Sequence, residues 1–447
     1  MIHQRIEFND EFKRALTLME DTSKHFFITG RAGTGKSTLL TCFREHTKKT
    51  IAVLAPTGVA ALNVNGETVH SFFGFMPETT LQSVKKLESN NKRLLMYQSL
   101  DTIVIDEISM VRADLLDCVD KFLRLNGKDS SLPFGGIQMI FIGDLYQLPP
   151  VETKDQKILF QDYYTSPYFF SARVFGDQQQ SLLSDNKFDF EIVELEKIYR
   201  QSDRKFIDIL NGVRNNSIQE KHLTELNSRV NKEFKPKVDD FWICLTATNR
   251  QAAEINAERL KTIKGKARTF KGSFSGMVDD RSFPTERTLS VKKGVQVMMV
   301  SNSPSGSWVN GSIGVVEDFE YNKDDGQDTV IIKLLSGKLI KVTPHMWDVL
   351  HWTYDNTKKS IASESIGSFT QYPFRLAWAI TIHKSQGKTF DRVIIDVGPS
   401  TFASGQMYVA LSRCRSLEGL VLKHNITKRH ILLDKRVAQF MTGFRNT

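Results

Sequence analysis

Four short apolar segments in the first part of the chain each end in a small or acidic residue. They are "HFFITG", "TIAVLAPTG", "LDTIVIDE" and "IQMIFIGD", all between Lys24 and Val174. Their apolar residues run continuously instead of alternating, which is typical of strands covered on both faces, as in a parallel sheet flanked by helices. The pattern predicts a doubly wound α/β domain over residues 1–190.

The pattern changes twice more along the chain. A long mixed segment after the second apolar run predicts a small insertion at about residues 66–95. The strand-helix pattern resumes in "FWICLTATNRQAAEINAERL", which predicts a second α/β domain from residue 191. Between residues 271 and 364, short alternating runs are separated by NG, SG and DG pairs, which predict antiparallel hairpins.

The segment "AWAITIHKSQGKTF" returns to the pattern of a buried strand. We therefore expect residues 191–270 and 365–447 to form one domain, with residues 271–364 inserted into it as a small β-barrel.

Composition adds a preference for anionic partners. The 447 residues include 60 Lys and Arg against 51 Asp and Glu, which gives a net charge of +9. Such a balance favours partners such as nucleic acid. The four cysteines are scattered without a CxxC pair, so neither a disulfide framework nor a zinc site is indicated. The chain has no signal-like start and no long apolar run, which predicts an intracellular protein with no membrane contact.

The segment "ITGRAGTGKST" has the spacing of a phosphate-binding loop. Gly30, Gly35, Lys36 and Ser37 follow a predicted strand and open a predicted helix. Main-chain N–H groups and the helix N-terminus can surround phosphates, Lys36 can reach the outer phosphates, and Ser37 can hold Mg²⁺. The alternative is a glycine-rich turn with a chance lysine.

Acidic and polar side chains follow two further strands. Asp106 and Glu107 end "TIVIDE", where a carboxylate suits Mg²⁺ and its neighbour suits activation of water in phosphoryl transfer. The alternative is an acidic pair that caps the next helix. In "FIGDLYQLPPV", Gln147 can sense an outer phosphate, although a simple turn after the strand explains the segment equally well.

The order of motifs resembles that of PIF-type (petite integration frequency) DNA helicases of superfamily one. The segments that carry the resemblance are "GRAGTGKS", "APTGVAALNVNGETVHSFFG", "VIDEISMV", "PFGGIQMIFIGDLYQLPPV", "AWAITIHKSQGKTF" and "GQMYVALSRCRS". The resemblance implies an α/β fold with two RecA-like P-loop domains, a small insertion in the first and a Src-homology-like β-barrel in the second. It also implies ATP hydrolysis in the cleft between the domains, coupled to 5′ to 3′ movement along single-stranded DNA.

The resemblance also assigns roles to single residues. Those implied to contact the nucleotide are Gly30, Ala32, Gly33, Thr34, Gly35, Lys36, Ser37, Thr38, Gln386 and Gly387. Those implied to act in catalysis are Lys36, Glu107, Gln147, Arg200 and Arg413, and those implied to hold Mg²⁺ are Ser37 and Asp106. Arg200 and Arg413 match arginine fingers, which stabilise charge on the transferred phosphoryl group. For Arg413, a surface salt bridge is the alternative.

The implied contacts with DNA come from several motifs. They are Thr57, His70, Phe72, Pro149, Thr248, Asn249, His383, Lys384 and Ser385. Aromatic rings stack on bases whatever the sequence, and hydroxyls and main-chain amides bind phosphates. Burial in the core is the alternative for Phe72 and for the neighbouring Phe73 and Phe75.

Two features leave alternatives open. Relatives often carry a glutamine near the N-terminus that reads adenine, where this chain has Phe12. A basic run, composed of Lys261, Lys264, Lys266, Arg268 and Lys271, fits a nucleic-acid footprint and a solvated edge equally well.

The predicted function is that of an ATP-dependent DNA helicase, with roles in DNA repair, recombination or telomere maintenance. We expect a monomer that binds single-stranded DNA, its junctions with duplex and G-quadruplexes. It would act in the bacterial cytoplasm, at the nucleoid, or in a eukaryotic nucleus or mitochondrion. The alternatives are a RecD-like recombination motor, an ATP-gated protein that binds or remodels single strands, and a small-molecule P-loop kinase. The kinase leaves the second domain unexplained.

Overall fold

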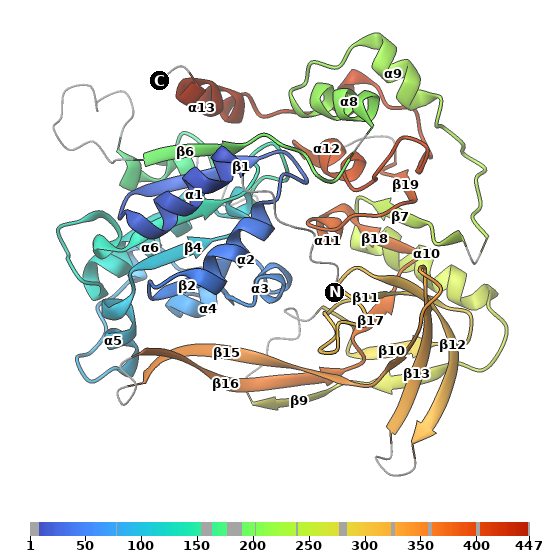
Figure 1. Cartoon of the computed structure of the whole chain (residues 1–447), viewed down its shortest axis with the longest axis horizontal. Helices are drawn as coiled ribbons and strands as arrows, with labels where there is room; N and C mark the ends of the chain where they lie inside the picture. Colours follow the sequence, from blue (N-terminus) through green and yellow to red (C-terminus); the bar gives the residue numbers. More distant parts are fainter. Residues whose placement is uncertain are drawn as a thin grey trace. The chain divides into compact units, whose positions relative to one another are not determined.

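Two compact units make up the chain. The computed structural model (Figure 1) describes residues 9–76, 78–152, 163–176, 190–201, 203–237, 240–276, 284–322, 327–355, 360–398 and 403–445. The N-terminal unit comprises Ile2–Tyr199, Leu350–Ile366 and Lys435–Thr447, and the C-terminal unit comprises Arg200–Val349 and Gly367–Asp434.

A parallel sheet forms the centre of the N-terminal unit. In sheet order its strands are β3 (Glu67–Thr68), β2 (Ile51–Ala55), β4 (Thr102–Ile105), β5 (Gln138–Ile142), β1 (His25–Gly30) and β6 (Phe190–Leu195). Every residue of β4 and β5 is buried, as expected for strands covered on both faces. Because β6 pairs with β1 along its whole length, this sheet extends beyond the predicted domain boundary at residue 190.

Helices connect these strands. They are α1 (Asp10–Asp21), α2 (Lys36–His46), α3 (Gly58–Asn63), α4 (Val69–Phe73), α5 (Lys92–Ser99), α6 (Ala113–Asn126) and α13 (Lys435–Arg445). Short 3₁₀ turns lie at η1 (Leu81–Ser83), η2 (Ile108–Met110), η3 (Pro133–Gly136), η4 (Phe169–Ser171) and η5 (Arg173–Phe175). The predicted insertion at residues 66–95 thus begins in the sheet itself, since β3 pairs with β2.

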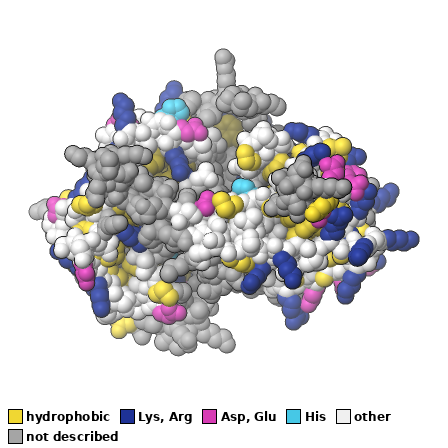
Figure 2. All heavy atoms as spheres, turned by 90° about the horizontal axis from the view of Figure 1, so that it is seen from below, with side chains coloured by type: hydrophobic (Ala, Val, Ile, Leu, Met, Phe, Trp, Pro, Cys, Tyr) yellow, Lys and Arg dark blue, Asp and Glu magenta, His cyan; other side chains and the backbone are white. Residues whose placement is uncertain are grey.

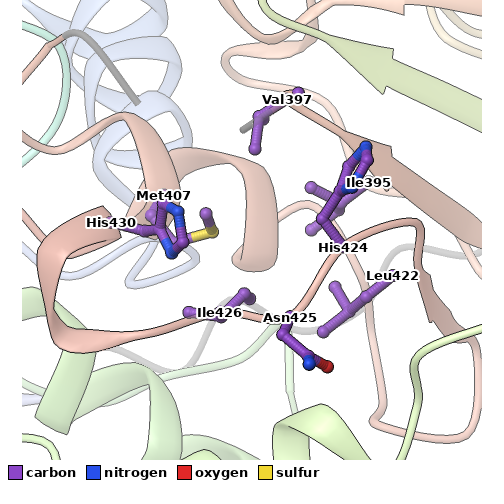
Figure 3. Close-up of a pocket in the computed structure, with 9 residues that line it drawn as sticks. Ile395, Val397, Met407, Leu422, His424, Asn425, Ile426 and His430 are labelled. Carbon is purple, nitrogen blue, oxygen red and sulfur yellow. The ribbon is translucent and has the colours of Figure 1, made fainter. Parts of the chain in front are cut away.

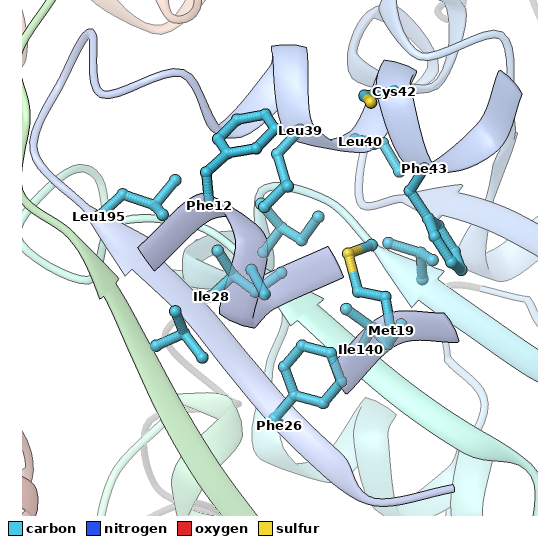
Figure 4. Packing of buried hydrophobic residues seen from close by; sticks show 14 of the residues in the cluster. Phe12, Met19, Phe26, Ile28, Leu39, Leu40, Cys42, Phe43, Ile140 and Leu195 are labelled. Atoms are coloured by element: carbon cyan, nitrogen blue, oxygen red, sulfur yellow. The ribbon is translucent and has the colours of Figure 1, made fainter. Parts of the chain in front are cut away.

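One face of the sheet packs against α1 and α2 (Figure 4). Phe12 and Met19 of α1 meet Leu39 of α2 over Ile28 of β1 in a cluster of buried side chains. Burial of side chains of this size contributes about 1.5 to 3 kcal/mol each. Phe12 is only 5% exposed, so the residue that replaces the adenine-reading glutamine belongs to this core.

Aromatic rings cover the other face. Successive side chains of a strand point to opposite faces, and Phe27 and Phe141 accordingly meet Phe169 at centroid distances of 5.3 Å each. Phe170 stacks on Phe440 of α13 at 4.2 Å. The C-terminal helix therefore packs on the N-terminal unit, although the sequence pattern predicts residues 365–447 as part of the second domain.

The C-terminal unit has its own parallel sheet. In order its strands are β18 (Ala379–Thr381), β7 (Ile243–Thr246), β19 (Val393–Asp396) and β20 (Leu420–Leu422). Its helices are α8 (Arg204–Arg214), α9 (Glu220–Asn227), α10 (Asn249–Thr262), α11 (Ile382–Ser385) and α12 (Gln406–Leu411), with a 3₁₀ turn at η8 (Lys428–His430).

An antiparallel region lies in the chain between α10 and β18. Its main sheet contains β14 (Leu339–Val342), β13 (Gln327–Leu334), β12 (Ile313–Asn322), β11 (Gln296–Met299) and β17 (Phe374–Leu376). Two smaller sheets contain β10 (Thr288–Val291) with β8 (Arg268–Lys271), and β15 (His345–Asp355) with β16 (Ser360–Gln371) and β9 (Ser273–Gly276). Val297, Val316 and Ile332 are among the buried residues of its core. In the chain, this region lies between two strands of a parallel sheet, β7 and β18, and its strands run from Arg268 to Leu376, beyond the predicted bounds of 271 and 364.

Two further properties bear on function. In the described part of the chain, no helix combines the length and the apolar character needed to cross a membrane. Cys42, Cys118, Cys244 and Cys414 are all buried and free.

Candidate functional site

The glycine-rich loop joins β1 to α2. Gly30 ends β1, and a Cβ atom there would lie 2.5 Å from the main-chain oxygen of Leu195. Gly35 caps α2 with a left-handed φ of 91°. Both positions therefore require glycine. The loop presents its main-chain N–H groups together with the N-terminus of α2, an arrangement that binds phosphate.

The other predicted nucleotide residues of this segment gather around the same loop. The ammonium of Lys36 donates to the main-chain oxygens of Gly30, at 2.7 Å, and Arg31, at 3.1 Å. Thr34 is buried and its hydroxyl donates to the main-chain oxygen of Arg31, whereas Ser37 and Thr38 lie in the first turn of α2, where both are exposed to solvent. Ala32 is buried and Gly33 half-buried. The structure thus places a cation and two hydroxyl-bearing residues where phosphates would bind.

Asp106 and Glu107 follow β4, the strand next to β5. Burial raises the pKa of Asp106 to about 7, the charge of Glu107 adds to that rise, and Lys36 acts in the opposite direction. Glu107 has a φ of 50°, a left-handed conformation that is strained for a residue with a side chain. Adjacent carboxyl groups in such surroundings favour a bound cation, and carboxylate and hydroxyl oxygens suit Mg²⁺. Asp106 and Ser37 therefore fit the metal site that the resemblance implies.

Gln147 is held in place by Asp144. Its Nε2 donates to Oδ2 of Asp144 at 3.1 Å, and the N–H of Tyr146 donates to Oδ1 at 3.2 Å. Asp144 is only 1% exposed. No role was predicted for Asp144, although an acidic residue three positions before the glutamine could have indicated one. The segment does form a turn, so the sensing role of Gln147 stays a prediction.

Tyr199 is an aromatic residue near the loop that the sequence analysis missed. Its N–H donates to the main-chain oxygen of Gly33 at 2.9 Å, and its ring lies 3.9 Å from a Cβ atom built on Gly35. The side chain is 50% exposed. The ammonium of Lys197 lies over the ring, 5.4 Å from its centroid. A half-exposed aromatic ring beside a phosphate-binding loop can accept the base of a nucleotide by stacking on its other face.

The two predicted arginine fingers lie together in the C-terminal unit. Nη1 of Arg200 donates to the main-chain oxygen of Ser412 at 3.4 Å, directly before Arg413. Arg413 is 1% exposed and donates to the main-chain oxygens of Val409, Ser385 and Lys388. The alternative of a surface salt bridge for Arg413 is therefore wrong, because its side chain is buried among carbonyl oxygens.

The segment after β18 contains one further correction. His383 is half-buried and Lys384 exposed, whereas Ser385 is fully buried and its hydroxyl donates to Ile382 at 2.7 Å. The Ser385 hydroxyl therefore serves the short helix α11 and does not face a DNA strand in this structure. Gln386 is half-buried, and Gly387 is exposed.

Two threonines occupy equivalent places in the two units. Thr57 follows β2 and caps α3, with its hydroxyl oxygen accepting from the N–H of Ala60 at 3.2 Å. Thr248 follows β7 and caps α10 in the same way, accepting from Gln251 at 3.2 Å. Both threonines are exposed. Their hydroxyl hydrogens stay available to an anion, as the predicted DNA contacts require.

The remaining predicted DNA residues differ in accessibility. Phe72 is fully buried and makes edge contacts with Phe73 and Tyr97, so its ring belongs to the core and has no free face for a base. His70 and Pro149 are half-buried, and Asn249 is exposed. Burial lowers the pKa of His70, and the charge of Arg112 lowers it further, so the imidazole is neutral at pH 7.

The basic run is largely exposed along its length. Arg268 forms an ion pair with Asp328 and lies over the ring of Phe319, while Lys261, Lys264, Lys266 and Lys271 are open to solvent. Figure 2 shows Lys and Arg side chains interspersed with acidic ones on the face that it presents. Both interpretations of the run stay open.

A small pocket lies apart from all of these residues (Figure 3). Its lining comes from β19, α12, β20 and the segment that follows β20, with His424 and His430 among mainly apolar side chains. None of the predicted nucleotide or DNA residues lines it.

Known proteins resemble this chain over nearly its full length. The model of the PIF1-like helicase family matches residues 7–223, and that of the UvrD-like helicase C-terminal domain matches residues 376–421. ATP-dependent DNA helicase Pif1 of Bdellovibrio bacteriovorus is 31% identical, over 99% of this chain and 93% of its own. ATP-dependent DNA helicase RRM3 of Saccharomyces cerevisiae is 29% identical over 96% of this chain, which spans 66% of the yeast protein.

Solved structures agree with the fold. Pif1 from a Bacteroides species in complex with ADP-AlF4 superposes with a TM-score of 0.86 at 35% identity, covering 98% of this chain and 97% of that one. Bacteroides Pif1 bound to ssDNA has a TM-score of 0.69 at 35% identity over the same shares. The predicted α/β fold with two RecA-like domains is thereby confirmed. The chain belongs to the PIF1-like helicase family.

Proposed function

We propose that this chain is an ATP-dependent DNA helicase that moves along single-stranded DNA, and that its ATP hydrolysis depends on residues from both units. The observation that carries the proposal is the phosphate-binding loop with Lys36 at its centre and the Asp106–Glu107 pair in charge range of that lysine. Family membership supports the same conclusion.

Within the nucleotide site, each group has a distinct task. The loop N–H groups and Lys36 bind the phosphates, and Ser37 and Asp106 would hold Mg²⁺, which offsets phosphate charge when bound. Glu107 orients the attacking water and accepts its proton. Gln147, fixed by Asp144, responds to the γ-phosphate, and the ring of Tyr199 stacks on the base.

The arginines of the C-terminal unit supply positive charge for the transferred phosphoryl group. Arg200 is half-buried and Arg413 is buried, so we assign direct contact with phosphate to Arg200. Arg413 positions the segment of residues 385–388, to which it is hydrogen-bonded. That segment includes Gln386 and Gly387, which we assign to the nucleotide site, and it follows His383 and Lys384, which we assign to DNA. A change in the bound nucleotide can therefore alter the contacts with DNA through this segment.

The DNA strand would contact the carboxyl ends of parallel strands in each unit. Thr57 and Thr248 offer hydroxyl groups. Asn249 and Lys384 are exposed, and His70, Pro149 and His383 are accessible in part. Bacteroides Pif1, with a similar fold, has been solved bound to ssDNA. We propose single strands and their junctions with duplex as partners, a monomer as the active form, and an intracellular location.

Hydrolysis of ATP with and without oligothymidylate tests this proposal. We expect Mg²⁺-dependent hydrolysis that single-stranded DNA stimulates. Hydrolysis at the same rate with and without DNA would instead favour a P-loop enzyme that acts on a small molecule.

A further inference from the structure

Three cationic side chains lie close together in the C-terminal unit with little to balance their charge. They are Arg375 on β17, Lys384 in α11 and Lys388 just after α11. The charge of Arg375 acts on both lysines. We call Arg375, Lys384 and Lys388 the cation cluster. Like charges repel, so such a cluster is costly unless an anion joins it.

The described residues supply almost no anionic partner to the cation cluster. In the described ranges, neither the Arg375 guanidinium nor the Lys384 ammonium forms a hydrogen bond or an ion pair. Glu286 acts on Arg375 and Lys384 by its charge alone, without an ion pair to either. Lys388 donates to a neutral acceptor, Oδ1 of Asn310, at 2.6 Å.

Lys388 connects two parts of the unit. Its main-chain oxygen accepts from Arg413, and its ammonium reaches Asn310 in the loop between β11 and β12 of the antiparallel region. The side-chain stem passes 4.0 Å from a Cβ atom built on Gly311. Lys388 is half-buried, and this burial, with Arg375 nearby, lowers the pKa of its ammonium to about 8. Taking a cation partly out of water against a neutral amide costs stability, so its presence needs another reason.

We propose that the cation cluster binds one phosphate group of the DNA strand between the segment after β18 and the β11–β12 loop. The inference rests on the proposed helicase function. The exposed Lys384 follows His383, and β18 lies beside β7, whose end carries Thr248 and Asn249. The cluster therefore lies at the sheet edge assigned to DNA, with Lys384 exposed and with Arg375 and Lys388 half-buried. A phosphate oxygen would give Lys388 the anionic partner that Asn310 does not provide.

The test compares Lys388→Met and Arg375→Met with Lys341→Met. Lys341 is exposed on β14 and paired with Glu320, so its replacement removes the same charge outside the cluster. The probe is fluorescent oligothymidylate, bound without nucleotide at several salt concentrations. We expect the cluster variants to bind about three- to tenfold more weakly, with a salt slope smaller by about 0.7, the value for one phosphate contact on a single strand. Slopes and affinities equal to those of Lys341→Met would overturn the proposal.

Two further measurements distinguish a DNA phosphate site from a nucleotide site and from a structural role. Affinity for a fluorescent ADP should stay unchanged; a loss there, with unaltered DNA binding, would assign the cluster to nucleotide phosphate and overturn the DNA assignment. The melting temperature of Lys388→Met should stay equal or rise, because a half-buried charge is removed from the neighbourhood of Arg375. A fall in melting temperature with an unchanged salt slope would make Lys388 a structural residue. Wild-type protein that does not bind oligothymidylate would contradict the proposed function itself.

Discussion

The guanidinium of Arg413 donates to the main-chain oxygen of Lys388 at 3.1 Å. A second hydrogen bond from the same Nη1 reaches Ser385 at 3.4 Å. Arg413 thus holds both ends of the short segment of residues 385–388, and this segment follows directly on the predicted DNA contacts His383 and Lys384. Any shift of Arg413 in response to nucleotide would move that segment as well.

This arrangement predicts different outcomes for the two arginines. Arg200→Ala should lower the rate of hydrolysis about a thousandfold or more at near-native stability, as for loss of an arginine finger. Arg413→Ala should slow hydrolysis too. In addition, it should lower the free energy of unfolding by roughly 1 to 3 kcal/mol, because it leaves buried carbonyl oxygens without a donor. Single-turnover ATPase assays and thermal melting separate the two effects.

Arg415 supplies the matched control for both variants. It lies on the same loop as Arg413, is exposed and pairs with Asp391. Arg415→Ala should therefore change neither the rate of hydrolysis nor the free energy of unfolding appreciably. Hydrolysis by Arg200→Ala at the wild-type rate would remove Arg200 from the catalytic site.

Glu107→Gln should bind nucleotide but lose turnover by about a hundredfold to ten-thousandfold, the usual contribution of a general base. The measurement pairs fluorescent ADP binding with steady-state ATPase. Glu45→Gln, an exposed position on α2, should match the wild type. Full turnover in Glu107→Gln would show that another group activates the water.

The same variant should change how Mg²⁺ binding depends on pH. The proton and Mg²⁺ compete for Asp106, so the apparent Mg²⁺ affinity falls about tenfold per unit as pH drops below the pKa of that carboxyl group. The negative charge of Glu107 raises the pKa of Asp106. The Glu107→Gln substitution removes this charge, so it should lower that pKa and move the onset of the fall in Mg²⁺ affinity to lower pH. Comparison with wild type at each pH cancels the titration of the nucleotide itself. An identical profile in both proteins would contradict the role of Asp106.

Tyr199→Ala should weaken nucleotide binding by about 1 to 3 kcal/mol, the range for loss of one base-aromatic stack. Tyr199→Phe keeps the ring and should keep the affinity. Titration with fluorescent ADP measures both. Equal affinity of Tyr199→Ala and wild type would leave base recognition to other residues.

His70 and Phe72 are two residues apart and should respond in opposite ways. Phe72→Leu should lower the melting temperature, because it leaves space among buried rings, and should leave DNA affinity unchanged. His70→Ala should weaken DNA binding without changing the salt slope, because the lowered pKa keeps this imidazole neutral at pH 7. Weaker DNA binding by a folded Phe72→Leu protein would restore the predicted base contact.

These two residues also show what the sequence could and could not predict. Motif spacing placed Gly30, Asp106 and Glu107 at strand ends and Lys36 at the start of a helix, as the structure has them, because local backbone geometry dictates glycine and acidic positions there. The string "TVHSFFG" does not show which side of a five-residue helix faces the core, so Phe72 was assigned to DNA although it is buried.

Contacts between segments that are distant along the chain could not be predicted from the sequence. Arg413 is buried by carbonyl groups up to 28 positions away, and Lys388 meets Asn310 at a separation of 78 residues. No local pattern encodes either pairing. The aromatic stack between Phe170 and Phe440, by which α13 packs on the N-terminal unit, could not be predicted for the same reason.

The central claim is that this chain uses ATP to separate DNA strands by moving along one of them. Its most direct test is unwinding of matched duplexes that carry a 5′ tail, a 3′ tail or no tail, with ATP and Mg²⁺ and with Glu107→Gln as the inactive reference. We predict that wild-type protein unwinds the 5′-tailed duplex and leaves the other two intact. Failure on every duplex, together with ATP hydrolysis stimulated by single strands, would contradict the claim and identify a strand-binding or remodelling protein.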